Sequence, residues 1–390
     1  MSTISEESAE LFESLDRALE SSTPAEAVDR LAEALADRGE FRALLDARLL
    51  RARLDLGLPP VLSGPLTDLP EPARSQYEER YVEAIREVGR RLLDSGEIGA
   101  AWAYFRAIAE KEPVFEAIEA YAPAENDERI GQVVEVAFNQ GVHPRKGFSL
   151  ILDHYGTCSA ISAFESLPPE ESTRVACADR LVRRLHADLT LNLRAEIARR
   201  GQPLPPEGAP IADLIAGREW LFVDDSYHLD VSHLASTVRL SPLLVDPETI
   251  ALAVGLTDYG RNLSDRHRYE GDPPFEDHYG DHARYLGAVL GRDVEAAVDH
   301  FRVKLGTPDP DGRNEAIAAQ VLVRLLVKLG RSGEALDVAA EHLAHLPDAA
   351  LACPSVGQLC QSLGRLDRLA EIARARGDLV NYAAARLGRA

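Results

Sequence analysis

Cysteine and aromatic residues are scarce in this chain of 390 residues, and each shortage excludes a class of structure. The four cysteines include no CxxC pair, and they are too few to hold a chain of this length together through disulfides. Aromatic residues make up 6%, which is too little for a chain built mainly of β-sandwiches or β-propellers. The composition therefore favours neither a disulfide scaffold nor a large all-β fold.

Long apolar runs and positive charge are also scarce. No run approaches the roughly 18 apolar residues of a membrane span, and the opening residues lack the basic and apolar regions of a secretory signal. The chain has 43 basic and 64 acidic residues, a net charge of −21. Such a field repels phosphate backbones and anionic membrane surfaces. We therefore expect a cytoplasmic protein with no nucleic-acid partner and no membrane partner.

The common signatures of catalysis and cofactor binding are missing. The sequence contains no phosphate-binding GxxxxGK[ST], no GxGxxG after a strand, no GxSxG, no HExxH and no EF-hand loop. These absences argue against nucleotide hydrolases, dinucleotide oxidoreductases and the common α/β hydrolases. We expect no nucleotide cofactor.

Helix start and stop signals recur along most of the chain, whereas alternating strand patterns do not. Thr23-Pro24 and Asp246-Pro247 are examples, each with a capping side chain before a proline in the first turn. The apolar run Trp220–Val223 is compatible with a short strand and equally with a buried loop. The sequence therefore predicts an all-α fold.

The tripeptide Leu-Gly-Arg recurs in the last third of the chain, at residues 290–292, 329–331 and 363–365, at intervals of 39 and 34 residues. Glycine at a helix end supplies the left-handed conformation that closes the helix, so we expect positive φ at Gly330 and Gly364. From Asp281 onward the chain resembles the tetratricopeptide-like helical repeats, whose hairpins have a period of 34 residues. The resemblance is to the architecture. It implies a superhelical stack, or solenoid, whose concave surface often binds peptides or protein partners.

Three segments differ in composition. Residues 1–121 are expected to form an N-terminal helical segment and residues 281–390 the helical repeats. Residues 122–280 form an irregular middle with proline- and glycine-rich breaks between helices and with most of the clustered histidine and aspartate.

The middle segment contains the candidate metal ligands. Five of the 11 histidines lie between residues 228 and 282, several times more than an even distribution would place there. Imidazole and carboxylate groups at close spacing are the ligands that borderline divalent metals use. We take as candidate ligands of a divalent metal, zinc or iron, the residues His228, Asp230, His233, His278 and His282.

Local geometry favours some of these candidates over others. Asp230 is placed to cap a helix over Val231–Leu240, with His233 at its third position. A non-metal interpretation is that Asp230 is only a cap and His233 only a helix residue. His278 and His282 are four residues apart, but Gly280 and Asp281 look like a helix start, so we expect His278 to precede that helix.

Two smaller groups could also contribute chemistry. Cys158 follows His154 by four residues and could form a nucleophile and base pair, although the glycine at 156 is also explained by a helix end. Arg261, Arg266 and Arg268 form a basic island that could bind a carboxylate or phosphate. Ion pairs with nearby acids explain the same arginines and are favoured by the number of acids around them.

Two functional hypotheses follow. The first is a helical-repeat binding protein for a protein or peptide partner, with a candidate site for a divalent metal or small ligand in the middle segment. The alternative is a metal-dependent enzyme, a hydrolase or a non-haem iron oxygenase, that uses His228, Asp230, His233 and His278 or His282. Elemental analysis of the purified protein separates the two hypotheses.

Overall fold

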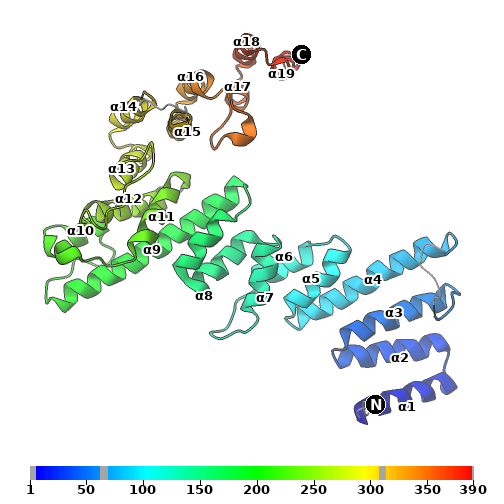
Figure 1. The fold of residues 1–390 in the computed structure, drawn as a ribbon. Coiled ribbons are helices and arrows are strands. Elements are labelled where there is room, and N and C mark those ends of the chain that lie inside the picture. Colours follow the sequence, from blue (N-terminus) through cyan, green and yellow to red (C-terminus); the bar gives the residue numbers. More distant parts are fainter. Residues whose placement is uncertain (1–5, 62–68, 307–312, 389–390) are drawn as a thin grey trace. The chain divides into compact units, whose positions relative to one another are not determined.

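The computed structural model describes residues 6–61, 69–306 and 313–388, and every regular element in these ranges is a helix (Figure 1). This confirms the predicted all-α fold. The run Trp220–Val223 lies in a 3-10 turn, Glu219–Asp225, and forms no strand. Parts of the expected segments, residues 1–5, 62–68, 307–312 and 389–390, lie outside the described residues. No helix in the described part is both long enough and apolar enough to cross a membrane.

The chain divides into two compact units, residues 1–154 and 155–390. The helix α8 (Pro144–Glu165) crosses this division, and its backbone leaves helical geometry at Gly156, where φ is 83° and ψ is 176°. The division falls inside residues 122–280, whereas the composition of the sequence placed boundaries at the ends of that segment.

The first unit is made of the helices α1 (Glu6–Ser21), α2 (Pro24–Asp37), α3 (Phe41–Asp55), α4 (Ala73–Asp94), α5 (Ile98–Ala107), α6 (Glu112–Ala120) and α7 (Ile130–Val134), a π-helical turn (Glu135–Asn139) and the start of α8. From α2 to α6, each helix packs against the one before it. As predicted, α2 begins at Pro24, because Thr23 and Glu26 cap each other's backbone N–H groups. The fully buried Val88 and Phe105 belong to the core of this unit.

The second unit begins with the end of α8 and the long helix α9 (Glu171–Arg199), which packs against α10 (Ile211–Ile215), α11 (Val231–Leu240), the 3-10 turn η4 (Ser241–Leu243) and α12 (Pro247–Arg261). The start of α12 is as predicted, because Asp246 accepts a hydrogen bond from the backbone N–H of Thr249 at 2.9 Å. These helices form the support on which the candidate site is built.

A close approach between two helices fixes the position of the next helix, α13 (His278–Val289). A Cβ atom on Gly260 of α12 would lie 2.4 Å from the ring of Tyr279, which is fully buried. Any larger residue at position 260 would therefore push α13 away from α12. Glycine at this position sets how closely the first turn of α13, which contains the candidate histidines, can approach α12.

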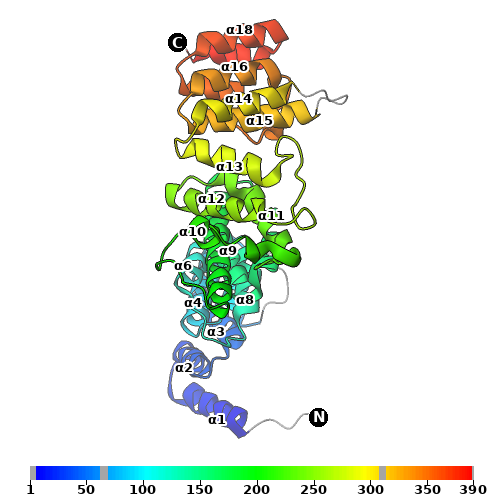
Figure 2. The same ribbon diagram turned by 90° about the vertical axis from the view of Figure 1, so that its left-hand side faces the viewer.

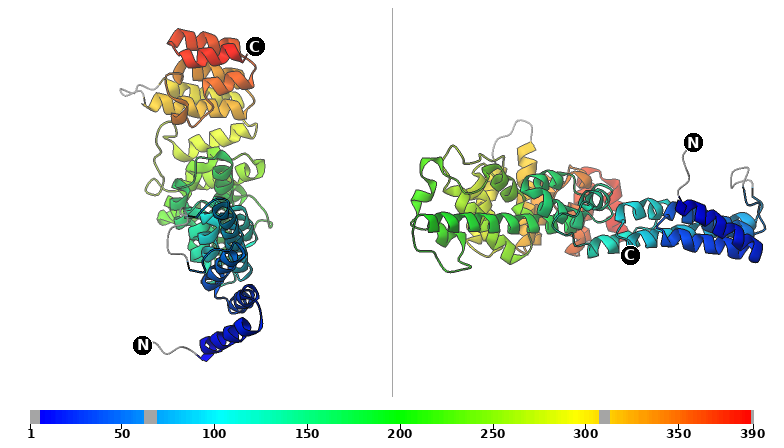
Figure 3. Two further views of the ribbon diagram at one scale, coloured as in Figure 1. Left: turned by 90° about the vertical axis from the view of Figure 1, so that its right-hand side faces the viewer. Right: turned by 90° about the horizontal axis from the view of Figure 1, so that it is seen from below.

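The remaining helices are α14 (Val294–Leu305), α15 (Arg313–Lys328), α16 (Ser332–His342), α17 (Val356–Ser362), α18 (Leu366–Arg376) and α19 (Leu379–Leu387), with a 3-10 turn, Asp348–Ala350, before α17. Each of these helices packs against the helix before it. Figures 2 and 3 show them in successive layers, from the yellow α13 and α14 to the red C-terminal helices. The φ angles of Gly330 and Gly364 are 73° and 66°, so the predicted left-handed conformation at these helix ends is confirmed.

Candidate functional site

The first three candidate ligands lie at the start of α11 and in the loop before it. Asp230 caps α11, as predicted, and its Oδ1 accepts hydrogen bonds from the backbone N–H groups of Ser232 at 2.8 Å and His233 at 3.3 Å. The hydroxyl of Ser232 donates to the same oxygen, and this bond, with the two backbone bonds, holds the pKa of the Asp230 carboxyl below its usual range. The Asp230 carboxylate therefore already has a structural role at the helix terminus.

His228 contacts a buried tyrosine of α12. Its backbone N–H donates to Oη of Tyr259 at 2.7 Å, and its Nδ1 lies 3.1 Å from the same oxygen. Burial lowers the pKa of His228 and raises the pKa of Tyr259 to about 12. Both groups are therefore neutral near pH 7, and the pair connects the loop before α11 to α12.

The last two candidates, His278 and His282, lie on one face of the first turns of α13. The expectation that His278 precedes this helix is wrong, because Asp277, not a later residue, caps it through a hydrogen bond from the backbone N–H of Gly280 at 3.3 Å. His278 is therefore the first helical residue, and its ring centroid lies 4.7 Å from that of His282. The structure brings these two imidazoles together.

Both imidazoles are buried, and one ring nitrogen of each forms a hydrogen bond with a backbone carbonyl. Nε2 of His278 lies 3.1 Å from the oxygen of Ala235, and Nδ1 of His282 lies 2.6 Å from the oxygen of His278. A carbonyl only accepts, so these nitrogens donate and the other nitrogen of each neutral ring is unprotonated. Burial lowers the pKa of both, to about 3 for His282, where the neighbouring His278 adds to the effect. Nε2 of His282 has no hydrogen-bond partner within the described structure.

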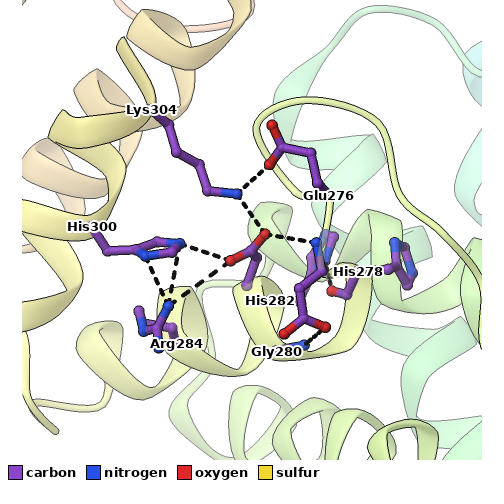
Figure 4. A network of polar contacts seen from close by, with 9 residues as sticks. Glu276, His278, Gly280, His282, Arg284, His300 and Lys304 are labelled. Carbon is purple, nitrogen blue, oxygen red and sulfur yellow. Dashed lines mark hydrogen bonds and ion pairs between the residues drawn. The ribbon is translucent and has the colours of Figure 1, made fainter. Parts of the chain in front are cut away.

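A polar network next to this pair connects α13 to α14. Asp281, whose side chain is 3% exposed, accepts from Nζ of Lys304 at 2.7 Å and pairs with Nε2 of His300 at 2.7 Å. Lys304 also pairs with Glu276 in the loop before α13. Lys304 and His300 extend from α14 toward the first turn of α13, and Arg284 lies on the same side as His300 (Figure 4).

Sequence reasoning missed Lys304 and His300 as members of this cluster. Lys304 lies 23 residues beyond Asp281, on the next helix, and no local pattern connects the two. A weak signal was present, because lysine occurs only four times in the chain. The contact itself depends on how α13 and α14 pack, which the local sequence does not specify.

The described residues contain no group of three or more His, Cys, Asp and Glu side chains placed to hold one metal ion. The Asp230 carboxylate caps α11, and the ring of His228 hydrogen-bonds to Tyr259. The ring of His278 hydrogen-bonds to the carbonyl of Ala235 and contacts the ring of His282. The five-residue metal site therefore stays a prediction from the sequence. Of the five candidates, the structure places the imidazoles of His278 and His282 next to each other, on α13.

The other two candidate groups have ordinary surroundings. Cys158 is exposed, beyond the irregular residue Gly156. The basic island is paired with acids. The Arg261–Asp258 and Arg268–Asp265 pairs, at 3.7 and 3.6 Å, join arginines to nearby acids, as the alternative interpretation predicted, whereas Arg266 pairs at 3.2 Å with Asp225, which is distant in the sequence. The arginines of these pairs are exposed to solvent, so each pair contributes little to stability.

A pocket of about 220 Å³ lies among the C-terminal helices, from the end of α16 to the start of α19. Its apolar lining includes Leu343, Leu346, Leu351, Val356, Leu369 and Ile372. Its polar lining includes Asp348, Ser355, Arg376, Asp378 and Asn381.

Most of the polar groups in this pocket already have partners. Ser355 donates to Asp348 at 2.9 Å, and Asp378 caps α19 by accepting from the backbone N–H of Asn381 at 3.0 Å. Arg376 is exposed, and within the described structure no carboxylate pairs with it. The pocket therefore combines an apolar wall with one available guanidinium.

No protein-family model matches this chain, and no curated protein matches it either.

Proposed function

We propose that this chain is a helical-repeat binding protein, and that a protein or peptide partner occupies the pocket between α16 and α19. The pocket is the observation that carries the proposal, because it brings several apolar side chains together with an exposed Arg376 that pairs with no carboxylate among the described residues. Solenoids of helical hairpins bind extended partners on such surfaces. The successive packing of α14 to α19 and the left-handed glycines at helix ends support the tetratricopeptide-like repeat architecture.

The pocket chemistry defines the ligand. A branched or unbranched aliphatic side chain would pack against Leu369 and Ile372, and a neighbouring carboxylate would pair with Arg376 in a charge-assisted contact. The partner is therefore a peptide segment with an aliphatic residue beside a carboxylate. That carboxylate is either an acidic side chain or the C-terminal carboxylate of the peptide.

Selection from a random peptide library on the immobilised protein tests this proposal. We expect enrichment of peptides with that pair of residues, and a labelled selected peptide should bind Arg376→Ala about tenfold more weakly, the loss of roughly 1.4 kcal/mol. Val303→Asp is the matched control, because Val303 is exposed on α14 and does not line the pocket. Failure to enrich any such peptide, or equal binding by Arg376→Ala and wild type, would reject the proposal.

The second hypothesis, a metal-dependent enzyme, rests on one observation. His278 and His282 each donate one ring N–H to a backbone carbonyl and keep the other nitrogen unprotonated. Metal-binding histidines are usually oriented by such a bond on the nitrogen that does not bind the metal. Further ligands would have to come from side chains that rearrange on binding, and elemental analysis tests this directly.

A further inference from the structure

The outward face of α19 is apolar and exposed. Leu379, Val380 and Leu387 have exposed fractions of 79%, 79% and 74%, and the alanines at 383 and 384 between them are exposed as well. At 100° per residue these five positions fall within one arc of about 140°, on the side away from the buried Ala385. A helix that is apolar on its inner and outer faces is normally covered on both.

The outward edge of α1 is also apolar, but its border is acidic. Phe12 is 61% exposed and Leu19 is 49% exposed, and the two residues are seven apart, so they lie on the same side of the helix. Exposed acidic side chains lie beside them, at Glu13, Asp16 and Glu20. The inner side of α1 packs against α2, so this edge faces away from the rest of the first unit.

The charges at these two helices are of opposite sign. The α19 sequence LVNYAAARL contains one arginine and no acid, although Asp378 caps it. The helix α18, packed against it, contains Asp367 and Glu371 in its first two turns and ends in Arg374 and Arg376. The α1 sequence EESAELFESLDRALES contains six acids and one arginine. In a chain with a net charge of −21, the last turn of α18 together with α19 therefore forms a locally basic surface to which an acidic surface can bind.

We propose that the occupant of the α19 face is the α1 edge of a second copy of this chain. Leu379, Val380 and Leu387 pack against Phe12 and Leu19, and the arginines beside α19 face the acids beside α1. This head-to-tail contact is heterologous, because the two partners use different surfaces. Each bound copy still offers one free α1 and one free α19, so association continues into short chains and does not stop at a dimer.

Charge excludes the two symmetric arrangements. Two α1 edges brought together would place Glu13, Asp16 and Glu20 against the same acids of the other copy. Two α19 faces brought together would oppose arginines in the same way. Like charges in direct contact are unfavourable, whereas the head-to-tail arrangement pairs each acid with a base. The apolar part of this interface is separate from the proposed peptide pocket, which Leu379, Val380 and Leu387 do not line, whereas Arg376 lines the pocket and also borders this interface.

Blocking one surface at a time provides the test. Sedimentation velocity of the full chain across micromolar concentrations should show mass rising with concentration past the dimer. Phe12→Asp and Leu387→Asp should each be monomeric when alone. An equimolar mixture of these two variants should form a one-to-one dimer and nothing larger, because only one complementary pair of surfaces remains. Val303→Asp, which places the same charge on exposed α14, should associate as wild type does.

Three outcomes would overturn the proposal. The first is a wild-type chain that stays monomeric over the whole concentration range. The second is a Phe12→Asp variant that still forms dimers alone, which would indicate a symmetric α19 contact. The third is a mixture of the two monomeric variants that does not associate. Circular dichroism of each variant checks that it is folded, and Leu387→Ser replaces Leu387→Asp if the acidic variant loses helix.

Discussion

Nζ of Lys304 lies 2.7 Å from Oδ2 of Asp281, and the side chains of these residues are only 14% and 3% exposed. The pair connects α13 to α14, and His300 on α14 contacts the other oxygen of the same carboxylate. Taking both charges out of water costs free energy, which the contact offsets only while both partners are present. The pair is therefore a strong constraint on how these two helices pack, and its loss should be measurable.

Lys304→Met should destabilise the protein, because it leaves the buried Asp281 carboxylate with His300 as its main partner. We expect a loss of about 3 kcal/mol in the free energy of unfolding, in the range found when one partner of a buried ion pair is removed. Urea unfolding followed by circular dichroism measures it. Adding Asp281→Asn to the same chain should recover part of the loss, since the buried carboxylate is then gone and only the half-exposed Glu276 lacks its lysine partner.

An exposed ion pair supplies the control for this prediction. Arg80 and Glu83 lie 3.0 Å apart on α4, and both side chains are more than half exposed. Arg80→Met should change the free energy of unfolding by about 0.5 kcal/mol or less. Equal effects of Lys304→Met and Arg80→Met would show that the Asp281–Lys304 contact has no special role.

Gly330→Ala should destabilise the helix end between α15 and α16. The φ angle of Gly330 is 73°, and no atom lies within 4 Å of where a Cβ would stand, so the cost is backbone strain and not a clash. A non-glycine residue in this conformation costs about 1 kcal/mol or more. Gly333→Ala is the matched control, because Gly333 lies in α16 with equally open surroundings. We expect a lower Tm for the first variant and an unchanged or higher Tm for the second.

Features set by a few neighbouring residues could be predicted from the sequence. The Asp230 and Asp246 caps needed only a carboxylate before a helix-forming run, and both are confirmed. The start of α13 shows the limit of this reasoning. Asp277 and Asp281 both stand near Gly280, and only the structure shows that the earlier one caps the helix while the later one is buried against Lys304.

Contacts between helices could not be predicted in the same way. The approach of Tyr279 to Gly260 depends on the packing of α13 on α12, and the ion pair between Asp281 and Lys304 depends on the packing of α14 on α13. In each pair, the two residues are far apart in the sequence. The histidine cluster in the sequence therefore included the two imidazoles that meet on α13, but it did not indicate which other side chains lie beside them.

The buried imidazoles should make the protein sensitive to acid. Burial lowers the pKa of His282 to about 3 in the folded state, whereas the unfolded value is about 6.5. The unfolded state therefore takes up the proton first, so this stabilising contribution is present above about pH 6.5 and is lost as the pH falls toward 3. Between about pH 7.5 and about pH 5.5, His282 alone should account for a loss of about 1.4 kcal/mol.

His282→Gln tests this, because glutamine does not titrate. Between about pH 7.5 and about pH 5.5, the free energy of unfolding of this variant should fall by about 1.4 kcal/mol less than that of wild type. His345→Gln is the control, because it makes the same substitution at an exposed position. An unaltered pH dependence in His282→Gln would mean that this imidazole is not kept neutral by burial.

The last prediction concerns metal content. If His278 and His282 supply the first two ligands of a zinc or iron site, the gently purified protein should contain close to one metal ion per chain, and added metal should raise its Tm. His282→Ala should abolish both effects, because it removes the unpartnered Nε2. His228→Ala and His233→Ala distinguish the full five-residue site from its α13 half. Loss of metal in these variants would mean that the loop before α11 and the first turn of α11 also supply ligands. Wild-type protein without stoichiometric metal and without a metal-dependent Tm would leave the imidazole pair as a purely structural contact and reject the enzyme hypothesis.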